Sequence, residues 1–316
     1  MERQSGIRYV LTEEEIARAR GVVITHPIRV FNLEGIGVHP ERFLRDLAPS
    51  FQRLSWDLYD VKREQVAFLR ERFPADAPWF DRFLPSYFAQ EGNVIDLIPY
   101  FRRLPTQDQI RFERIRSYRR RSIARFHLTN RATGNWDAQW HVVRTECHGF
   151  TQEVGGSDPR TIERIFDPTA AELVEHVEFH RLVIAVAEMT EDAEGDQGRV
   201  IQDLEITFHQ MGLLARPGEA RSNAPEGLHQ DGADYIVSAL VVVREGVVGG
   251  VSYITGADKQ THLLDLTLTP GLGIFHADKG SPLWHCVTAV ADEDGIAATR
   301  GERDIFGFDV NVIRRE

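Results

Sequence analysis

The segment from Asp203 to the C-terminus constrains the fold of this 316-residue chain more than any other part. Leu204, Ile206 and Phe208 alternate with polar residues, which is the two-residue period of a strand with one buried face. Further strand patterns, each bounded by turn residues, cover residues 235–243, 251–254, 262–268, 273–276, 283–290 and 305–313. Many short strands with regular turns predict a β-sandwich or a barrel.

The first hundred residues have mostly helical patterns instead. Thr12 and Glu15 form a capping box, which predicts a short helix over residues 13–20. Apolar residues at helical spacing predict a second helix through residues 51–61. The β-branched residues at 22–30 indicate a strand between the two helices.

A longer helix is expected beside the strands. Asp167 followed by proline is typical of a helix N-cap and first helical position, and predicts a helix over residues 168–188. The expected fold class is therefore α+β, mainly β with flanking helices. We expect a single domain over the 316 residues, with a mostly helical part at 1–105 and a β core at 106–316 braced by that helix.

Charge and composition exclude several classes of partner. The net charge of −11 disfavours nucleic acid and anionic membranes, because both prefer basic patches. No apolar stretch reaches the roughly 20 residues of a membrane span, and the N-terminus lacks an apolar signal segment. Two cysteines, Cys147 and Cys286, cannot form a disulfide framework. We expect a cytoplasmic protein, either a monomer or a homodimer.

An arginine-rich segment at residues 110–128 has two interpretations. Arg114, Arg116 and the run at 119–121 alternate with apolar residues. In one interpretation these arginines bind phosphate, and in the other they form the solvated face of a strand. The acidic net charge favours the solvated strand.

His229 and Asp231 are the first candidates for chemistry. Residues two positions apart in an extended backbone point to the same face, so one metal ion can accept a ligand atom from each. His285, on a later predicted strand, supplies a second imidazole. Two histidines and one carboxylate are the facial triad that binds Fe(II) with open coordination positions. His276 is the competing candidate for the third ligand.

Arg303 extends this pattern at the start of the last predicted strand. It shares one face with Ile305 and with Gly307, whose small size is expected to leave room for a ligand. A guanidinium binds a carboxylate in a bidentate pair, so Arg303 is placed to hold the distal carboxylate of 2-oxoglutarate. The other interpretation is a surface salt bridge, and Arg300 is a competing anchor. The position of Arg303 after the triad favours the cosubstrate.

Taken together, these motifs resemble the 2-oxoglutarate/Fe(II)-dependent dioxygenases of the bacterial L-isoleucine 4-dioxygenase type. The resemblance covers roughly residues 201–312. It is carried by the segment Pro225-Glu226-Gly227-Leu228-His229-Gln230-Asp231-Gly232, by Arg244 and Gly249-Gly250, by His285-Cys286-Val287-Thr288, and by Arg303-Asp304.

The resemblance implies a fold, a ligand set and three cofactors or cosubstrates. The core would be a double-stranded β-helix, also called a jelly roll or cupin-like barrel, with iron at its mouth. His229, Asp231 and His285 would be catalytic ligands of Fe(II), and Arg303 would anchor 2-oxoglutarate, with O2 as the second cosubstrate.

The implied substrate is a free amino acid or a close derivative, hydroxylated at an unactivated C–H bond with release of succinate and CO2. Arg216 and Arg244 are the candidates to bind its carboxylate. Cys286 and Ala289 replace the glycine and proline that are usual near the distal histidine, so the substrate pocket is expected to differ. The alternatives are a cupin-like metal-binding protein and an oxygen-independent metal-dependent isomerase or hydrolase, neither of which needs Arg303.

Overall fold

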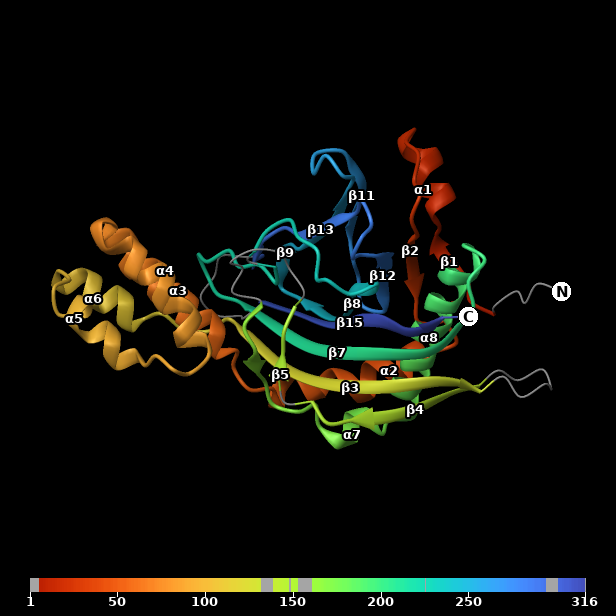
Figure 1. Ribbon diagram of the computed structural model, residues 1–316, viewed down its shortest axis with the longest axis horizontal. Helices are drawn as coiled ribbons and strands as arrows, with labels where there is room; N and C mark the ends of the chain where they lie inside the picture. The colour runs from red at the N-terminus through yellow and green to blue at the C-terminus, as the bar shows by residue number, and fades with distance from the viewer. Residues whose placement is uncertain are drawn as a thin grey trace.

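A large antiparallel sheet of eight strands organises the computed structural model (Figure 1). The structure describes residues 6–131, 139–147, 149–152, 161–224, 226–293 and 301–315. In spatial order, the strands are β1 (Tyr9–Leu11), β2 (Ile28–Asn32), β12 (Leu272–Ala277), β8 (Tyr235–Glu245), β15 (Gly301–Arg315), β7 (Ile201–Ala215), β3 (Arg119–Arg131) and β4 (Gln139–Thr145). The sheet and its helices confirm the α+β class.

A smaller sheet lies over the β8 and β15 region of the large one (Figure 1). It consists of β11 (His262–Thr267), β10 (Val251–Thr255) and β13 (Trp284–Val287). Two short pairs complete the strands: β9 (Val247–Gly249) with β14 (Val290–Asp292), and β5 (Gly149–Phe150) with β6 (Arg164–Ile165). The strand series predicted after Asp203 is confirmed, although the pattern at 283–290 is divided between β13 and β14.

Helices cover one face of the large sheet. They are α2 (Pro40–Leu47), the 3-10 helix η1 (Ala48–Arg53), the short α7 (Ala171–Val174) and α8 (Val177–Gly195). Phe179 of α8 contacts Phe208 of β7 and Phe306 of β15 edge to face, and all three rings are fully buried. Because side chains alternate along a strand, odd-numbered residues of β15 such as Arg303 point to the opposite face.

The remaining helices belong to the N-terminal part of the chain. They are α1 (Glu13–Arg20), α3 (Leu58–Arg72), η2 (Pro74–Asp76), α4 (Ala77–Phe88), η3 (Val94–Leu97), α5 (Ile98–Phe101) and α6 (Thr106–Glu113). The segment from α3 to α6 projects beyond the end of the sheet (Figure 1) and has its own apolar cluster, which includes Leu69 and Phe80. The capping box of α1 is present as predicted. Among the described helices, none is long and apolar enough to cross a membrane.

Two N-terminal predictions were correct in the type of element but wrong in its bounds, because strand pairing overrides local periodicity. The expected helix at 51–61 is interrupted: Trp56 bridges Arg120 of β3, and Asp57 N–H donates to the Arg119 carbonyl, so this stretch is extended. Asp57 then caps α3. The strand expected at 22–30 begins only at Ile28, where pairing with β12 starts.

The bracing helix does not begin at residue 168 as predicted. Ile123 of β3 bonds to both neighbours of Pro168: its N–H donates to the Asp167 carbonyl, and its carbonyl accepts from Thr169 N–H. These bonds hold Pro168 in an extended bridge. The helix α8 starts at Val177, with His176 as its N-cap, and runs to Gly195.

Candidate metal centre and its surroundings

His229, Asp231 and His285 converge at the small sheet. His229 and His285 form an isolated antiparallel bridge, in which each backbone N–H donates to the other carbonyl at 3.0 Å. The Nε2 atoms of the two histidines each lie 3.3 Å from a different carboxylate oxygen of Asp231. One candidate ligand atom from each residue lies within 4.8 Å of the others. Gly227 and Gly232, both at positive φ, turn the backbone on either side of the pair.

Hydrogen bonds orient this group toward a common point. His229 donates its Nδ1–H to the Gly227 carbonyl at 2.7 Å, which leaves Nε2 as the ring nitrogen that a metal ion can bind. Asp278 accepts the backbone N–H groups of Asp231, at 2.9 Å, and Gly232, at 2.7 Å. Its other oxygen lies 3.8 Å from His285 Nδ1, which has no hydrogen-bond partner in the described structure.

Charges within the group fit a divalent cation. Burial raises the pKa of Asp231, but His229 and His285 outweigh it and hold that pKa well below its usual range. Burial lowers the pKa of His229, yet the Asp231 carboxylate dominates and raises it to about 9. Burial and the neighbouring His229 lower the pKa of His285. Two imidazoles and an ionised carboxylate are the donor set that suits Fe(II).

His276 lies near this group without joining it. Its ring centroid is 5.2 Å from that of His285, and its Nδ1 pairs with the Ala277 carbonyl at 2.8 Å. Burial and the neighbouring His285 lower its pKa to about 3, so the ring is neutral. The structure therefore brings His285, rather than His276, into contact with Asp231.

Arg303 lines the same pocket as the three residues, a cavity of about 90 Å³. It is fully buried and donates from Nη1 to Asn223 Oδ1 at 2.7 Å, whereas Nε and Nη2 have no partner in the described structure. Burial and the adjacent Arg244 lower its pKa to about 10. The alternative considered from the sequence, a surface salt bridge, does not fit: Arg303 is buried and makes no ion pair with any described residue.

The glycine at position 250 makes room for this arginine. A Cβ there would lie 3.0 Å from Arg303 Cδ and 3.1 Å from Arg244 Nη1. Gly307 does not line the pocket, so its small size does not make room for a ligand there. A Cβ at this position would make ordinary contacts with Val237, His209 and Met211. Arg300 and Pro225 lie outside the described residues.

Two residues of the arginine run are buried, which contradicts the predicted solvated face. Strand register places Arg119 opposite Leu213 of β7, and Leu213 opposite Arg303. Arg121 lies opposite Met211, one row further along. Both arginines line the pocket of the candidate metal ligands. The alternation along β3 indicated a common face, but only the register shows that this face points inward.

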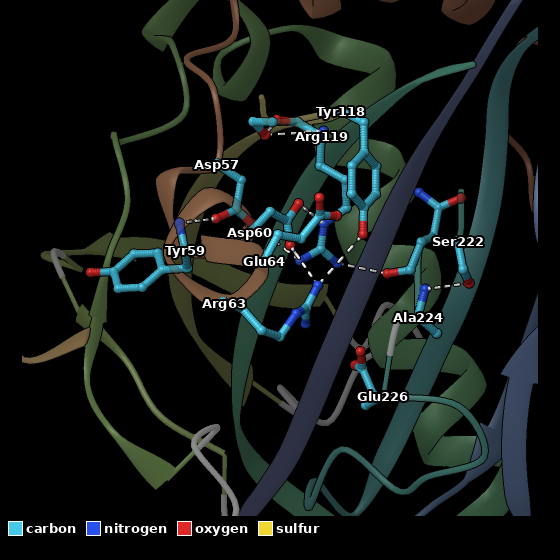
Figure 2. Close-up of polar contacts among 12 residues, drawn as sticks. Asp57, Tyr59, Asp60, Arg63, Glu64, Tyr118, Arg119, Ser222, Ala224 and Glu226 are labelled. Carbon is cyan, nitrogen blue, oxygen red and sulfur yellow. Dashed lines mark hydrogen bonds and ion pairs between the residues drawn. The ribbon is translucent and has the colours of Figure 1, made fainter. Parts of the chain in front are cut away.

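Arg119 connects the helical part to this pocket (Figure 2). Its guanidinium bonds both oxygens of Asp60, at 2.7 and 2.6 Å, and one oxygen of Asp57 at 3.3 Å. It also donates to the Asn223 carbonyl at 2.7 Å, and the side chain of Asn223 accepts from Arg303. Although burial lowers the pKa of Arg119, the carboxylates of Asp60 and Asp57 raise it well above its usual value.

The arginines expected to bind a substrate carboxylate have other contacts. Arg216 donates to the Ser117 carbonyl at 3.1 Å, and Arg244 donates to the Gly249 carbonyl at 2.7 Å. Neither residue lines the pocket. The sequence interpretation instead missed Gln152, whose Nε2 donates to Asp231 Oδ1 at 2.5 Å. No sequence pattern distinguishes Gln152 from other polar residues.

Comparisons with known proteins agree with this donor set. The family model described as 2OG-Fe dioxygenase matches residues 99–309, which is more than half of the chain. A crystal structure of a bsmA homologue from Methylobium petroleophilum PM1 has a TM-score of 0.59 at 17% identity, and the match covers 99% of this chain and 98% of that one. This similarity supports the fold over nearly the whole chain.

Two further solved structures match at lower similarity, and no curated protein matches the chain. IDO from Bacillus thuringiensis has a TM-score of 0.46 at 17% identity, covering 62% of this chain and 76% of that one. The Fe(II)/α-ketoglutarate-dependent dioxygenase TqaL has a TM-score of 0.43 at 13% identity, covering 79% and 89%. The match to the family model shows that the chain belongs to the 2OG-Fe dioxygenase family and is an oxidoreductase that uses Fe(II), 2-oxoglutarate and O2.

Proposed function

We propose that this dioxygenase hydroxylates an unactivated C–H bond of a free amino acid or a close derivative, as an enzyme of the L-isoleucine 4-dioxygenase type. The 2-oxoglutarate would be converted to succinate and CO2 in the same turnover. Family membership favours this function over an inert cupin-like protein and over an oxygen-independent isomerase or hydrolase. We also propose that the two facing sheets form a double-stranded β-helix within one catalytic domain over residues 1–316.

His229, Asp231 and His285 are the proposed Fe(II) ligands. The Nδ1–H bond of His229 to Gly227 and the contacts of Asp278 with the Asp231 backbone support this role, because they hold the ligand atoms in place before metal binds. The chemistry that iron supplies in this family is activation of O2 at the expense of 2-oxoglutarate. The protein contributes ligand geometry, orientation of both organic molecules and exclusion of water.

The observation that carries the proposal is the burial of the Arg303 guanidinium in this pocket. Two of its donors have no partner among the described residues, and such a buried guanidinium is costly unless a ligand satisfies it; the residue lines the pocket of the candidate metal ligands. A carboxylate of 2-oxoglutarate supplies two oxygens for those donors. Asn223 holds the guanidinium by a hydrogen bond, and Gly250 leaves room for the arginine side chain.

A substrate panel tests the proposed reaction. The iron-loaded protein is supplied with 2-oxoglutarate, O2 and each of the common free amino acids in turn, and succinate release and product mass are measured. We expect at least one amino acid to stimulate succinate release and to gain one oxygen atom. Succinate release that no amino acid or amino-acid derivative stimulates would contradict the substrate class. The complete lack of 2-oxoglutarate turnover would contradict the reaction itself.

A further inference from the structure

Two buried arginines without an ion pair in the described structure, Arg121 and Arg164, lie near the candidate metal ligands. Arg121 is 9% exposed and Arg164 is 8% exposed. Neither makes an ion pair with a carboxylate of the described structure, and the Nε of each has no hydrogen-bond partner there. Buried guanidinium groups are ordinarily paired, so this arrangement requires an explanation.

A neutral group holds Arg121 in place. Its Nη2 donates to His209 Nδ1 at 3.0 Å, and His209 Nε2 donates to Asp309 Oδ2 at 3.1 Å. Burial lowers the pKa of His209, so the imidazole is uncharged and uses its proton for Asp309. The chain of hydrogen bonds fixes the guanidinium, while its positive charge stays without a direct counter-ion.

Arg164 is held in the same way by an amide. Its Nη2 donates to Gln152 Oε1 at 2.8 Å, and the amide of Gln152 in turn donates to Asp231. The guanidinium groups of Arg121 and Arg164 both lie over the ring of Phe150. Burial, and after it the positive charge of the nearby Arg121, lowers the pKa of Arg164 to about 10.

Arg119 is a neighbouring arginine with a structural role, and it serves as a comparison for Arg121. It lies two residues before Arg121 on the same face of β3 and is equally buried, but it is paired with both Asp57 and Asp60 (Figure 2). The fold thus pairs Arg119 with two carboxylates and leaves Arg121 without an ion pair among the described residues. An uncompensated charge that lowers stability is typical of a binding site.

Arg121 also joins two cavities. It lines the pocket of the candidate metal ligands and a neighbouring cavity of about 640 Å³, and among the described lining residues it is the one that both share. The larger cavity lies between α3, α4 and β6, where Tyr59, Tyr87 and Phe166 line it. Its volume lies in the range of small-molecule sites.

We propose that Arg121, assisted by Arg164, binds the carboxylate of the primary substrate, which reaches it through the larger cavity. This assignment rests on the proposed function, and it leaves Arg303 for the cosubstrate. It also restricts the substrate to molecules with a free carboxylate, so that the corresponding amides and esters are excluded. Arg121 and Arg303 line the same pocket but bond to different residues, so either can be replaced without removing the bonds that hold the other.

Ligand binding to the full-length chain tests the assignment without turnover. The zinc-loaded protein is titrated with a panel of free L-amino acids and their carboxamides, and binding is followed by saturation-transfer NMR. We expect the tightest-binding amino acid to bind at least about 10-fold more weakly to Arg121→Gln, because a charge-assisted bond is lost. Arg121→Lys should restore part of the affinity, and the carboxamide should not compete.

Thermal melting separates this role from a structural one. Arg121→Gln should melt no lower than the wild type, because it removes a buried charge without a counter-ion. Arg119→Gln should melt lower, because it leaves Asp57 and Asp60 buried without their partner. A destabilised Arg121→Gln protein would show that Arg121 is structural.

Three binding results would overturn the proposal: unchanged amino-acid affinity in Arg121→Gln, equal binding of carboxamides, or a wild-type chain that binds none of the panel. Binding of 2-oxoglutarate with Fe(II) distinguishes this failure from failure of the proposed function. If Fe(II) and 2-oxoglutarate bind but the panel does not, the carboxylate site is wrong and the dioxygenase site stands. If Arg121 binds carboxylates but the cosubstrate does not bind, the proposed function is wrong and the carboxylate site stands.

Discussion

Replacement of Arg303 with glutamine is expected to weaken the binding of 2-oxoglutarate selectively. The guanidinium has two donors, Nε and Nη2, without a partner in the described structure, and both would bond the distal carboxylate. A hydrogen bond to a charged group contributes about 1.5–3 kcal/mol, so the loss of two costs about 3 kcal/mol or more. At about 1.4 kcal/mol per factor of ten, the Kd of 2-oxoglutarate should rise about 100-fold or more.

Anaerobic calorimetry on the Fe(II)-loaded protein measures this Kd. Arg303→Gln should fold and retain iron, because it removes a buried charge that no described carboxylate compensates. Arg216→Gln is the matched control, since the side chain of Arg216 bonds the Ser117 carbonyl outside the pocket, and its Kd should be unchanged. A folded, iron-loaded Arg303→Gln protein with wild-type affinity for 2-oxoglutarate would refute the anchor role.

Three other substitutions test the surroundings of the site. His285→Ala should abolish Fe(II) binding and succinate release, whereas His276→Ala should retain both. Iron analysis and a succinate assay measure the two effects, and the reverse result would show that His276 is the third ligand. Gly250→Ala should raise the Kd of 2-oxoglutarate, because its Cβ would displace Arg303 and its φ is +64°, and an unchanged calorimetric Kd would contradict this. Burial raises the pKa of Asp304 to about 7, so its ionisation should destabilise the fold as the pH rises toward 7. The free energy of unfolding in urea should therefore be up to roughly 4 kcal/mol higher for Asp304→Asn than for the wild type at pH 8, and much less so at pH 5. A difference that does not change with pH would contradict the raised pKa of Asp304.

Alternation along the strands made most of the core predictable. The pattern of Leu204, Ile206 and Phe208 identifies β7, and the same periodicity places Arg303 and Ile305 on one face of β15. These are local signals, because each strand buries one face throughout its length. The spacing of His229 and Asp231 was equally local, and the structure brings both residues to His285.

Contacts between distant segments were beyond the reach of the sequence patterns. Trp56 and Pro168 are extended because each pairs with β3, and neither pairing has a local signal. The burial of Arg119 depends on Asp57 and Asp60, which lie about sixty positions earlier in the chain. A charged run on an acidic protein therefore suggested a solvated face, although tertiary partners bury it.

The measurement that tests the account most directly is the visible spectrum of the anaerobic protein with Fe(II) and 2-oxoglutarate. Chelation of iron by the 2-oxo acid in the proposed site should give a weak metal-to-ligand charge-transfer band in the wild-type protein. We predict that His285→Ala lacks this band at every cosubstrate concentration and that Arg303→Gln develops it only at much higher 2-oxoglutarate. An iron-loaded wild-type protein without the band, or a His285→Ala protein that retains it, would contradict the proposed centre.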